Sequence, residues 1–352
     1  MTRTAVGTPS PPAPSHGDVT PPIERGSSSG PLPTRVAVGF SWLIGAAAVM
    51  GVAFAALHLA EERAFVEIVE RAVPAWLLVA TALQAATYAA EGQVWRLIAR
   101  AVGVPLGFWD AYKLSLAKLF VSQALPSAGL SGTVVAARAL SQRGFSRSTV
   151  MGGFVVDVAS YYAAYVVSLG VAMVVSIARG HASAAILSIA AVVAAFAITM
   201  TVVLLVFAGR EPPARLRKLV PFSLAERGLD LIRDADTNLT RDSRLLLRAG
   251  AFQMGIFLLD TMTMWFLILA LGTVAPPTAV FASFMTSSVL RTIGILPGGL
   301  GTFEATSVFT LTLAGVPIAV ALAATLAFRA LSFWLPMIPG LIYSRVMTRE
   351  PD

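Results

Sequence analysis

Six charged side chains lie inside or beside the long apolar stretches of this chain, which makes them the first candidates for chemistry. They are Glu91, Asp157, Asp260, Arg291, Glu304 and Arg329. A charge at the centre of a membrane helix costs about 2.5 to 3.5 kcal/mol on insertion scales, so each needs a partner, a cavity or a changed protonation state. The chain has no cysteine and only three histidines. We therefore expect no metal site, no thiol nucleophile and no cofactor.

A polar interruption at residues 296–304 begins with Leu-Pro and ends at Glu304. Its three glycines are Gly298, Gly299 and Gly301, and they precede a predicted helix. The free N–H groups and partial positive charge of a helix N-terminus suit a phosphate, and glycine lets the backbone come close to it. The other interpretation is that these glycines only permit a tight turn between packed helices. No Lys-Ser or Lys-Thr follows them, so this is not a nucleotide-binding loop.

A second interruption, at residues 125–132, occupies the matching place in another half of the chain, with Pro126 and Gly132 as its structural residues. Irregular backbone at membrane depth survives only where protein or a water-filled cavity surrounds it. Interruptions at equivalent points of a repeat are the best sequence pointer to the binding site of a transporter. Three anchors recur 171 residues apart: Pro105, Pro126 and Gly144 return as Pro276, Pro297 and Gly315. The spacing therefore indicates a carrier with a site between two halves.

The composition places these elements in a membrane. Hydrophobic residues make up 56% of the 352 residues, charged residues make up 13%, and the mean hydropathy is +0.76. A soluble domain has roughly a quarter charged residues. The net charge is +7, but the charged residues lie at the ends of apolar segments, where a membrane protein needs them. Binding to nucleic acid is therefore not expected.

The chain divides into a tail and one membrane domain. Residues 1–34, rich in proline, serine and glycine, are predicted to be a disordered cytoplasmic tail, because they cannot bury enough apolar surface. Residues 35–348 are predicted to be an all-α polytopic membrane domain with repeat halves at about 75–178 and 249–346. Residues 209–248 connect the halves as an amphipathic segment, either on anionic lipid or as a solvated linker. Full spans are expected at about 36–60, 75–99, 148–177, 182–208, 249–272 and 318–345.

Four shorter segments meet in pairs at the two interruptions: 108–126 with 128–143, and 278–296 with 299–314. They are either re-entrant hairpins, which leave six full transmembrane helices, or ordinary kinked helices, which give eight or more spans. Six spans put the basic loops and both termini in the cytoplasm, as the positive-inside rule requires. Equivalent helices are then three spans apart, so the halves form an inverted repeat. We therefore predict six spans and two re-entrant hairpins in a bacterial inner membrane.

Asp157 and Arg329 lie at nearly equivalent depths in matching spans of the two halves. We predict that they pair across the repeat interface, either as a structural ion pair or as a gate that opens for an anionic headgroup. Arg138, Arg291 and Arg329 are the cations nearest to the interruptions, and arginine suits phosphate because its planar fork donates two hydrogen bonds. Glu304 is expected to orient one of these arginines or to take up a proton.

The pattern Pro-Gly-Gly-x-Gly-x-x-Glu at residues 297–304, followed by Arg329, resembles a signature of the lysylphosphatidylglycerol synthase transmembrane region. This is a family of flippase-like membrane proteins of bacteria and archaea. The first interruption, with Gly132 and Arg138 after its Leu-Pro, resembles the other signature of that family. Thr133 stands where the family often has an acidic residue, so any role of that acid is lost or moved here.

The resemblance covers about residues 36–346 and implies a membrane domain that flips lipids. In the synthases this domain is followed by a soluble aminoacyl-transfer domain. A chain of 352 residues has no room for it, so we do not expect lipid aminoacylation.

Together these observations predict a protein that moves a phospholipid or a polyprenyl-phosphate-linked lipid between leaflets without ATP of its own. Its expected partners are an anionic lipid or lipid-linked phosphate and the bilayer. The alternatives are a membrane-embedded enzyme acting on a lipid or lipid-linked sugar, and a scaffold that assists such an enzyme. Six scattered ions without histidine or cysteine offer a poor catalytic site, so no enzyme activity is expected. The predicted lipid-binding residues are Arg138, Arg291, Gly298, Gly299, Gly301, Glu304 and Arg329.

Overall fold

The computed structural model describes residues 69–124, 130–180, 183–211, 232–293 and 299–348. Regular secondary structure in these residues is helical throughout, and they contain no strand, so the expected all-α architecture is confirmed. The tail at 1–34, the first expected span and three singled-out residues, Pro126, Pro297 and Gly298, lie outside the described part.

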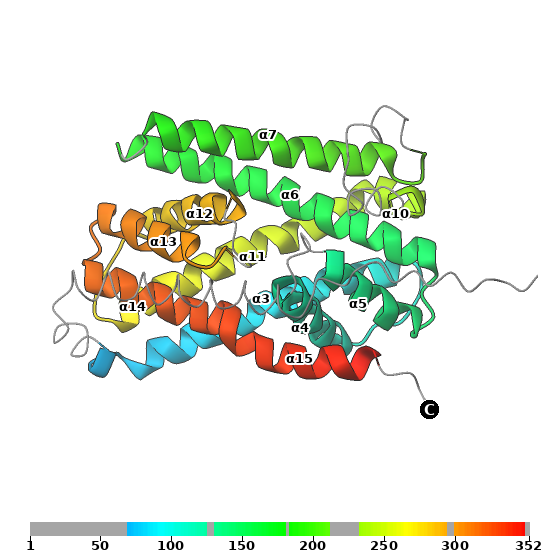
Figure 1. Cartoon of the computed structure of the whole chain (residues 1–352), viewed down its shortest axis with the longest axis horizontal. Helices are drawn as coiled ribbons and strands as arrows, with labels where there is room; N and C mark the ends of the chain where they lie inside the picture. Colours follow the sequence, from blue (N-terminus) through cyan, green and yellow to red (C-terminus); the bar gives the residue numbers. More distant parts are fainter. Residues whose placement is uncertain (1–68, 125–129, 181–182, 212–231, 294–298, 349–352) are drawn as a thin grey trace, which may run out of the picture.

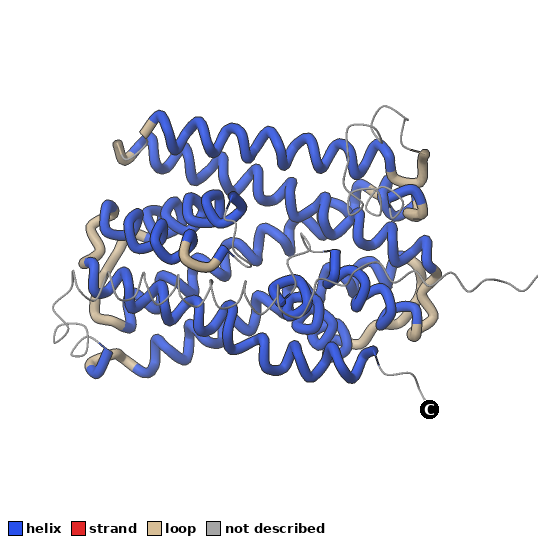
Figure 2. The backbone as a smooth tube through the Cα atoms, in the orientation of Figure 1, coloured by secondary structure: helices blue, strands red, loops and turns tan. Residues whose placement is uncertain are grey.

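Long helices run side by side along the length of the molecule, as Figures 1 and 2 show. They are α3 (Pro74–Ala101), α6 (Arg147–Ala178), α7 (Ala184–Phe207) and α11 (Ser243–Ala270). Four helical stretches are long and apolar enough to cross a membrane: α6, α7, α11 and the continuous helix Ile318–Val346. Each has at least 24 residues, above the about 20 that a bilayer requires. The chain is therefore a multi-pass membrane protein.

Side-chain caps explain where several helices begin. Ser146 and Ser183 accept hydrogen bonds from backbone N–H groups at the starts of α6 and α7. Asp242 accepts from the N–H groups of Arg244 and Leu245, so α11 begins at Ser243, six residues before the expected 249. Such caps satisfy N–H groups that have no partner within the helix.

Two pairs of short helices lie at opposite ends of the bundle (Figure 1). α4 (Phe108–Ala124) and α5 (Leu130–Ser141) lie beside the beginning of α6 and the end of the chain. α12 (Pro277–Ile293) and α13 (Thr302–Leu313) lie at the other end. These pairs correspond to the short segments expected on either side of each interruption.

Part of the connector between the halves packs against protein. The short helix α10 (Thr237–Arg241) contacts α6, and the Asp236 N–H donates to the carbonyl of Ser148 at 3.0 Å. Gly152 permits this approach, since a Cβ there would lie 3.0 Å from the Asp236 nitrogen. Residues 212–231 of the connector lie outside the described part, so its proposed place on lipid stays a prediction.

The last span contains a widened turn. α14 (Ile318–Arg329) continues through a π-helical turn, η2 (Ala330–Trp334), into α15 (Leu335–Thr348). Within η2 the Leu335 N–H donates to the Ala330 carbonyl, five residues back. By the same pattern the Leu331 carbonyl would need an N–H from residue 336, which is a proline and has none. The hydroxyl of Tyr88 on α3 donates to this carbonyl instead, at 3.0 Å.

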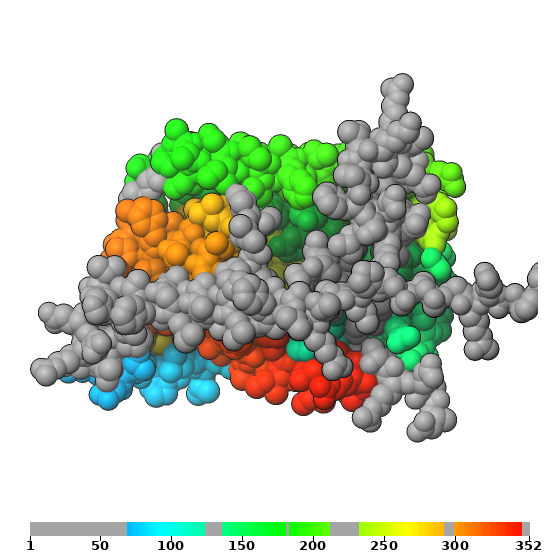
Figure 3. Space-filling view, viewed as in Figure 1, coloured from blue at the N-terminus to red at the C-terminus, as the bar shows by residue number. Residues whose placement is uncertain are grey.

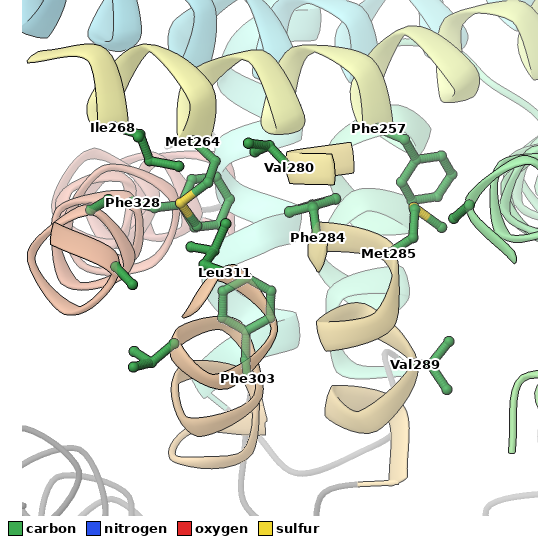
Figure 4. Close-up of a cluster of buried hydrophobic side chains, with 14 of the residues drawn as sticks. Phe257, Met264, Ile268, Val280, Phe284, Met285, Val289, Phe303, Leu311 and Phe328 are labelled. Carbon is green, nitrogen blue, oxygen red and sulfur yellow. The ribbon is translucent and has the colours of Figure 1, made fainter. Parts of the chain in front are cut away.

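Two apolar clusters form the core. The cluster shown in Figure 4 includes Phe257, Met264, Phe284, Phe303 and Phe328, contributed by α11, α12, α13 and α14. The other cluster joins α3, α4, α5, α6 and α10 around Trp95, Leu140 and Phe154. Outside these clusters, α7 exposes large apolar side chains along one edge of the molecule (Figure 3). An exposed apolar helix face of this length fits contact with lipid.

Candidate functional site

A buried ion pair joins the second hairpin to the last span. Glu304, in the first turn of α13, is fully buried, and Arg329, at the end of α14, is 4% exposed. Arg329 Nε donates to Glu304 Oε1 at 2.6 Å, and the Gly301 N–H donates to Glu304 Oε2 at 2.6 Å. One carboxylate therefore holds both the start of α13 and the arginine. This is the kind of orienting contact that the sequence analysis expected of Glu304.

Two guanidinium groups share one aromatic ring. Arg329 lies 4.6 Å from the ring centre of Phe333 and 5.4 Å from that of Phe303. Arg291, near the end of α12, lies 5.9 Å from the Phe303 ring. Cations above an aromatic face are attracted by its quadrupole. With Glu304 ionised, this cluster carries a net charge of +1, and we call it the arginine cluster (Arg291, Glu304 and Arg329).

Backbone conformation and steric contact both explain why glycine occurs in the second interruption. Gly299 and Gly301 have φ angles of +65° and +84°, in the left-handed region that residues other than glycine rarely adopt. A Cβ at Gly299 would also collide with Cγ of Arg291. The Gly301 N–H, at the start of α13, donates to Glu304. These facts support the tight-turn interpretation of the glycines; an added role in binding phosphate stays a prediction.

The predicted pairing of Asp157 with Arg329 is wrong, because each has a nearer opposite charge. Asp157 on α6 binds Lys118 Nζ on α4, and Lys118 also binds Glu91 Oε1 on α3 at 2.6 Å. Arg329 binds Glu304. Each ion pair thus joins a long helix to a neighbouring short one, α6 to α4 and the helix Ile318–Val346 to α13, whereas matching depths in the sequence say nothing about which faces meet. We call Glu91, Lys118, Asp157 and Gln253 the carboxylate cluster.

Lys118 is a residue that sequence reasoning missed. It lies within the predicted hairpin segment 108–126. A lysine inside such a segment is itself the signal for a buried partner. Gln253 on α11 completes the cluster: its amide donates to Asp157 Oδ1 at 3.0 Å and to Glu91 Oε2 at 3.3 Å.

A third group of polar side chains surrounds Asp260 on α11. Gln84 Nε2 and Thr87 Oγ1 of α3 donate to Asp260 Oδ1 at 3.1 and 3.3 Å. Arg291 is close enough to Asp260 for their charges to interact, and Tyr161 lies beside Arg291. Asp260 and Tyr161 therefore lie between the arginine cluster and the carboxylate cluster.

A cavity of about 310 Å³ opens beside Asp260, between α3, α4 and the widened turn of the last span. Gln84 lines it, is 3% exposed, and has no hydrogen-bond partner for its Oε1 among the described residues. The other lining residues, most of them apolar, are Thr81, Ala85, Tyr88, Tyr112, Leu116, Leu331, Leu335, Pro336, Ile338 and Pro339.

Similarity to known proteins shows the family of this chain. Residues 36–340 match the model of the lysylphosphatidylglycerol synthase TM region. The chain belongs to that family. It is 23% identical over 294 residues to a UPF0104 membrane protein of Methanothermobacter thermautotrophicus, a match covering 77% of this chain and 85% of the relative. A UPF0104 membrane protein of Methanocaldococcus jannaschii is 30% identical over 96 residues, which cover 27% of this chain and 29% of that protein.

The part of the chain that matches the lysylphosphatidylglycerol synthase TM region includes both hairpins and all three polar groups. Two residues assigned to its first signature lie apart from the arginine cluster. Gly132 and Arg138 lie within α5, and Arg138 is exposed near the end of that helix, away from α12 and α14 (Figure 1). The expectation that Arg138 joins Arg291 and Arg329 is therefore wrong, because the two hairpins occupy opposite ends of the bundle.

Proposed function

We propose that this protein moves a lipid with a phosphate-containing headgroup between the two leaflets of a membrane. The observation that carries the proposal is the arginine cluster, two arginines and one carboxylate around the buried Phe303 ring. Arginine is positively charged and can donate two hydrogen bonds to a phosphate, so these side chains suit an anionic headgroup. Phosphate binding at Arg291 and Arg329 is therefore part of the proposal.

The proposed topology has six spans, two re-entrant hairpins and an inverted repeat. Its support is the position of the hairpins at opposite ends of the bundle (Figure 1). Basic residues are concentrated at the end that holds α4 and α5, and they include Arg100, Arg143, Arg147, Arg244 and Arg345. The positive-inside rule makes this end cytoplasmic. Both termini are then cytoplasmic, and the bacterial inner membrane is the proposed location.

The cavity beside Asp260 gives a place for part of the lipid next to the proposed headgroup site. Its lining is mostly apolar, and Leu335 and Ile338 at its margin are 54% and 63% exposed. An apolar cavity open to the lipid-facing side suits a hydrocarbon chain. The polar end, at Gln84 and Tyr88, lies toward Asp260 and hence toward Arg291.

An enzyme acting on a lipid phosphate is the competing function, and the geometry favours it less. A general base needs an oxygen that can reach the proton it abstracts. Glu304 is fully buried, so it cannot reach a proton on a bound lipid, and its oxygens accept from Arg329 and from the Gly301 N–H. Glu304 is therefore suited to positioning an arginine.

A leaflet-sidedness assay with the purified protein in vesicles tests the proposal. Labelled phosphatidylglycerol, phosphatidylethanolamine, a polyprenyl phosphate and, as the uncharged control, diacylglycerol are compared with protein-free vesicles. We expect faster exchange of at least one phosphate-bearing lipid. Loss of a charged hydrogen bond costs about 1.5 to 3 kcal/mol, so Arg291→Gln should weaken half-saturation by roughly ten- to hundredfold.

Arg138→Gln is the matched control, because it removes the same charge from an exposed position in the other hairpin. We expect it to leave exchange unchanged. Exchange no faster than in protein-free vesicles for every lipid contradicts the function. Equal effects of the two variants contradict the placement of the headgroup at the arginine cluster.

A further inference from the structure

We propose that the carboxylate cluster binds one proton and exchanges it during each transport cycle. The inference rests on the proposed lipid transport and adds its source of energy. A proton would thereby be the coupled ion of this carrier.

The geometry of the cluster is that of two carboxylates held in common by two donors. Lys118 Nζ donates to Oδ2 of Asp157 and to Oε1 of Glu91. The Gln253 amide donates to the other oxygen of each carboxylate, Oδ1 of Asp157 and Oε2 of Glu91. The four groups come from four helices, α4, α11, α6 and α3, so the cluster is where these helices are tied together.

The carboxylate cluster is largely buried, so a net charge on it costs free energy. Asp157 and Gln253 are each 2% exposed as whole residues, and the side chains of Lys118 and Glu91 are 22% and 19% exposed. Two ionised carboxylates and one ammonium leave a net charge of −1. Unpaired charge at such depth is costly. One proton on either carboxylate makes the cluster neutral.

The charged and titratable groups nearby do not supply the missing positive charge. Arg291 interacts with Asp260, which also accepts hydrogen bonds from Gln84 and Thr87. Arg329 is bound to Glu304. The groups that face the cluster are Trp95 on α3, whose ring is 5.9 Å from Lys118 Nζ, and Tyr161 on α6, which is within range of the charge of Glu91. Among these described groups, one carboxylate of the pair is left without a counter-ion.

The N–H donors around the two carboxylates favour a proton over a sodium ion. All four carboxylate oxygens of Glu91 and Asp157 accept from the ammonium of Lys118 or the amide of Gln253. A sodium ion would need several oxygen ligands turned toward it, and in this cluster those oxygens face N–H donors. A proton needs only one lone pair, and a carboxylate oxygen that accepts one hydrogen bond keeps a second.

Protonation of the cluster changes how strongly α4 is bound to the long helices α3 and α6. Lys118 lies on α4, whereas its two partners lie on the long helices α3 and α6. With both carboxylates ionised, the lysine has two ionic partners, and with one of them protonated it has one. Protonation therefore biases the position of α4, as any ligand with different affinity for two states does. Tyr161 beside Arg291 connects this equilibrium to the proposed headgroup site.

Infrared spectroscopy of the protein in vesicles tests the proton directly, without transport. We expect wild type at neutral pH to show the C=O band of one protonated carboxyl group. Glu91→Gln and Asp157→Asn should each remove the band completely, because the remaining carboxylate then faces one ammonium and ionises. Asp260→Asn is the matched control and should keep the band. Absence of the band in wild type, or its persistence in both single variants, overturns the inference.

A pH difference across the vesicle membrane tests the coupling. With one proton moved per lipid, a difference of about one unit should produce a steady lipid asymmetry of roughly tenfold. A protonophore should abolish this asymmetry, and Glu91→Gln and Asp157→Asn should exchange lipid only to equal distribution. Exchange in wild type that stays symmetric under the pH difference, or that follows a sodium gradient instead, overturns proton coupling and leaves the proposed function standing. Absence of any lipid exchange overturns the function, and the infrared band still decides whether the proton site exists.

Discussion

At the scale of single residues, each buried charge pairs with the opposite charge that helix packing brings nearest. Glu304 and Arg329 meet because α13 and α14 follow each other closely and pack together. Asp157 meets Lys118 because α4 packs into the half of the bundle to which α6 belongs. Removing one member of a buried pair is costly because the other charge is stranded, so each pair constrains its hairpin.

Gly299 and Gly315 allow the effect of the Arg291 contact to be isolated. Both have positive φ angles, +65° and +91°, so alanine strains the backbone at either position. A Cβ at Gly299 also collides with the Arg291 side chain, whereas at Gly315 it meets no atom within 4 Å. We expect Gly315→Ala to lower the free energy of unfolding by about 1 to 2 kcal/mol. Gly299→Ala should cost more and should displace Arg291, which is measured by thermal unfolding and by lipid half-saturation.

Equal loss of stability in the two variants, with lipid half-saturation unchanged in Gly299→Ala, would contradict a role for the Gly299 turn in placing Arg291. The glycine would then serve the backbone turn alone.

At the scale of elements, the widened turn in the last span depends on another helix. Proline at position 336 leaves the Leu331 carbonyl without a backbone donor, and Tyr88 supplies one. π-helical turns of this kind occur frequently at functional sites. Here the turn directly follows Arg329 and lines the cavity beside Asp260. The arginine, the turn and the cavity thus form one continuous feature.

Replacing Tyr88 by phenylalanine should destabilise this feature. A buried carbonyl that loses its partner costs about 1 to 3 kcal/mol, so Tyr88→Phe should unfold at a lower temperature. Tyr112→Phe is the control, since the Tyr112 hydroxyl has no hydrogen-bond partner among the described residues. Adding Pro336→Ala to Tyr88→Phe provides a backbone N–H for the Leu331 carbonyl and should restore part of the loss. A double variant no more stable than Tyr88→Phe alone would show that the hydroxyl does not cap this carbonyl.

At the scale of the whole molecule, the two helix pairs lie at opposite ends of one bundle (Figure 1). This gives the molecule two similar ends, each with a short pair of helices and a buried ion pair nearby. A carrier with alternating access requires a site that each side can reach in turn, and opposed hairpins provide one route to it. The proposed inverted repeat would explain why the two ends resemble each other.

Cysteine labelling tests the proposed topology, and the natural chain contains no cysteine to interfere. A cysteine at position 143 should react with a membrane-impermeant reagent only from the cytoplasm, and one at position 274 only from outside. Val274 is 85% exposed, so its replacement is tolerated. A cysteine at Val192, 69% exposed on the apolar face of α7, should stay unlabelled because lipid covers it. Labelling of position 143 from outside, or of 274 from the cytoplasm, would contradict the topology.

The sequence alone predicted much of the helical architecture because apolar length and charge are local properties. The runs at 148–177, 182–208, 249–272 and 318–345 are long and apolar enough to be recognised as spans, and the structure has a long helix at each. Proline and glycine likewise marked the boundary between the two helices of each hairpin, since their backbone effects need no distant partner. The family was also readable, because the pattern at residues 297–304 lies within eight consecutive residues.

Only the tertiary structure decided which charges meet. Lys118, Glu91 and Gln253 are far from Asp157 in sequence, and their meeting depends on the faces along which four helices pack. The same holds for Tyr88, which contacts a carbonyl 243 residues away. The 171-residue repeat gave Asp157 and Arg329 similar depths but no information on helix rotation. Depth is set by the sequence through hydrophobic length, whereas partners are set by the packing of helix against helix.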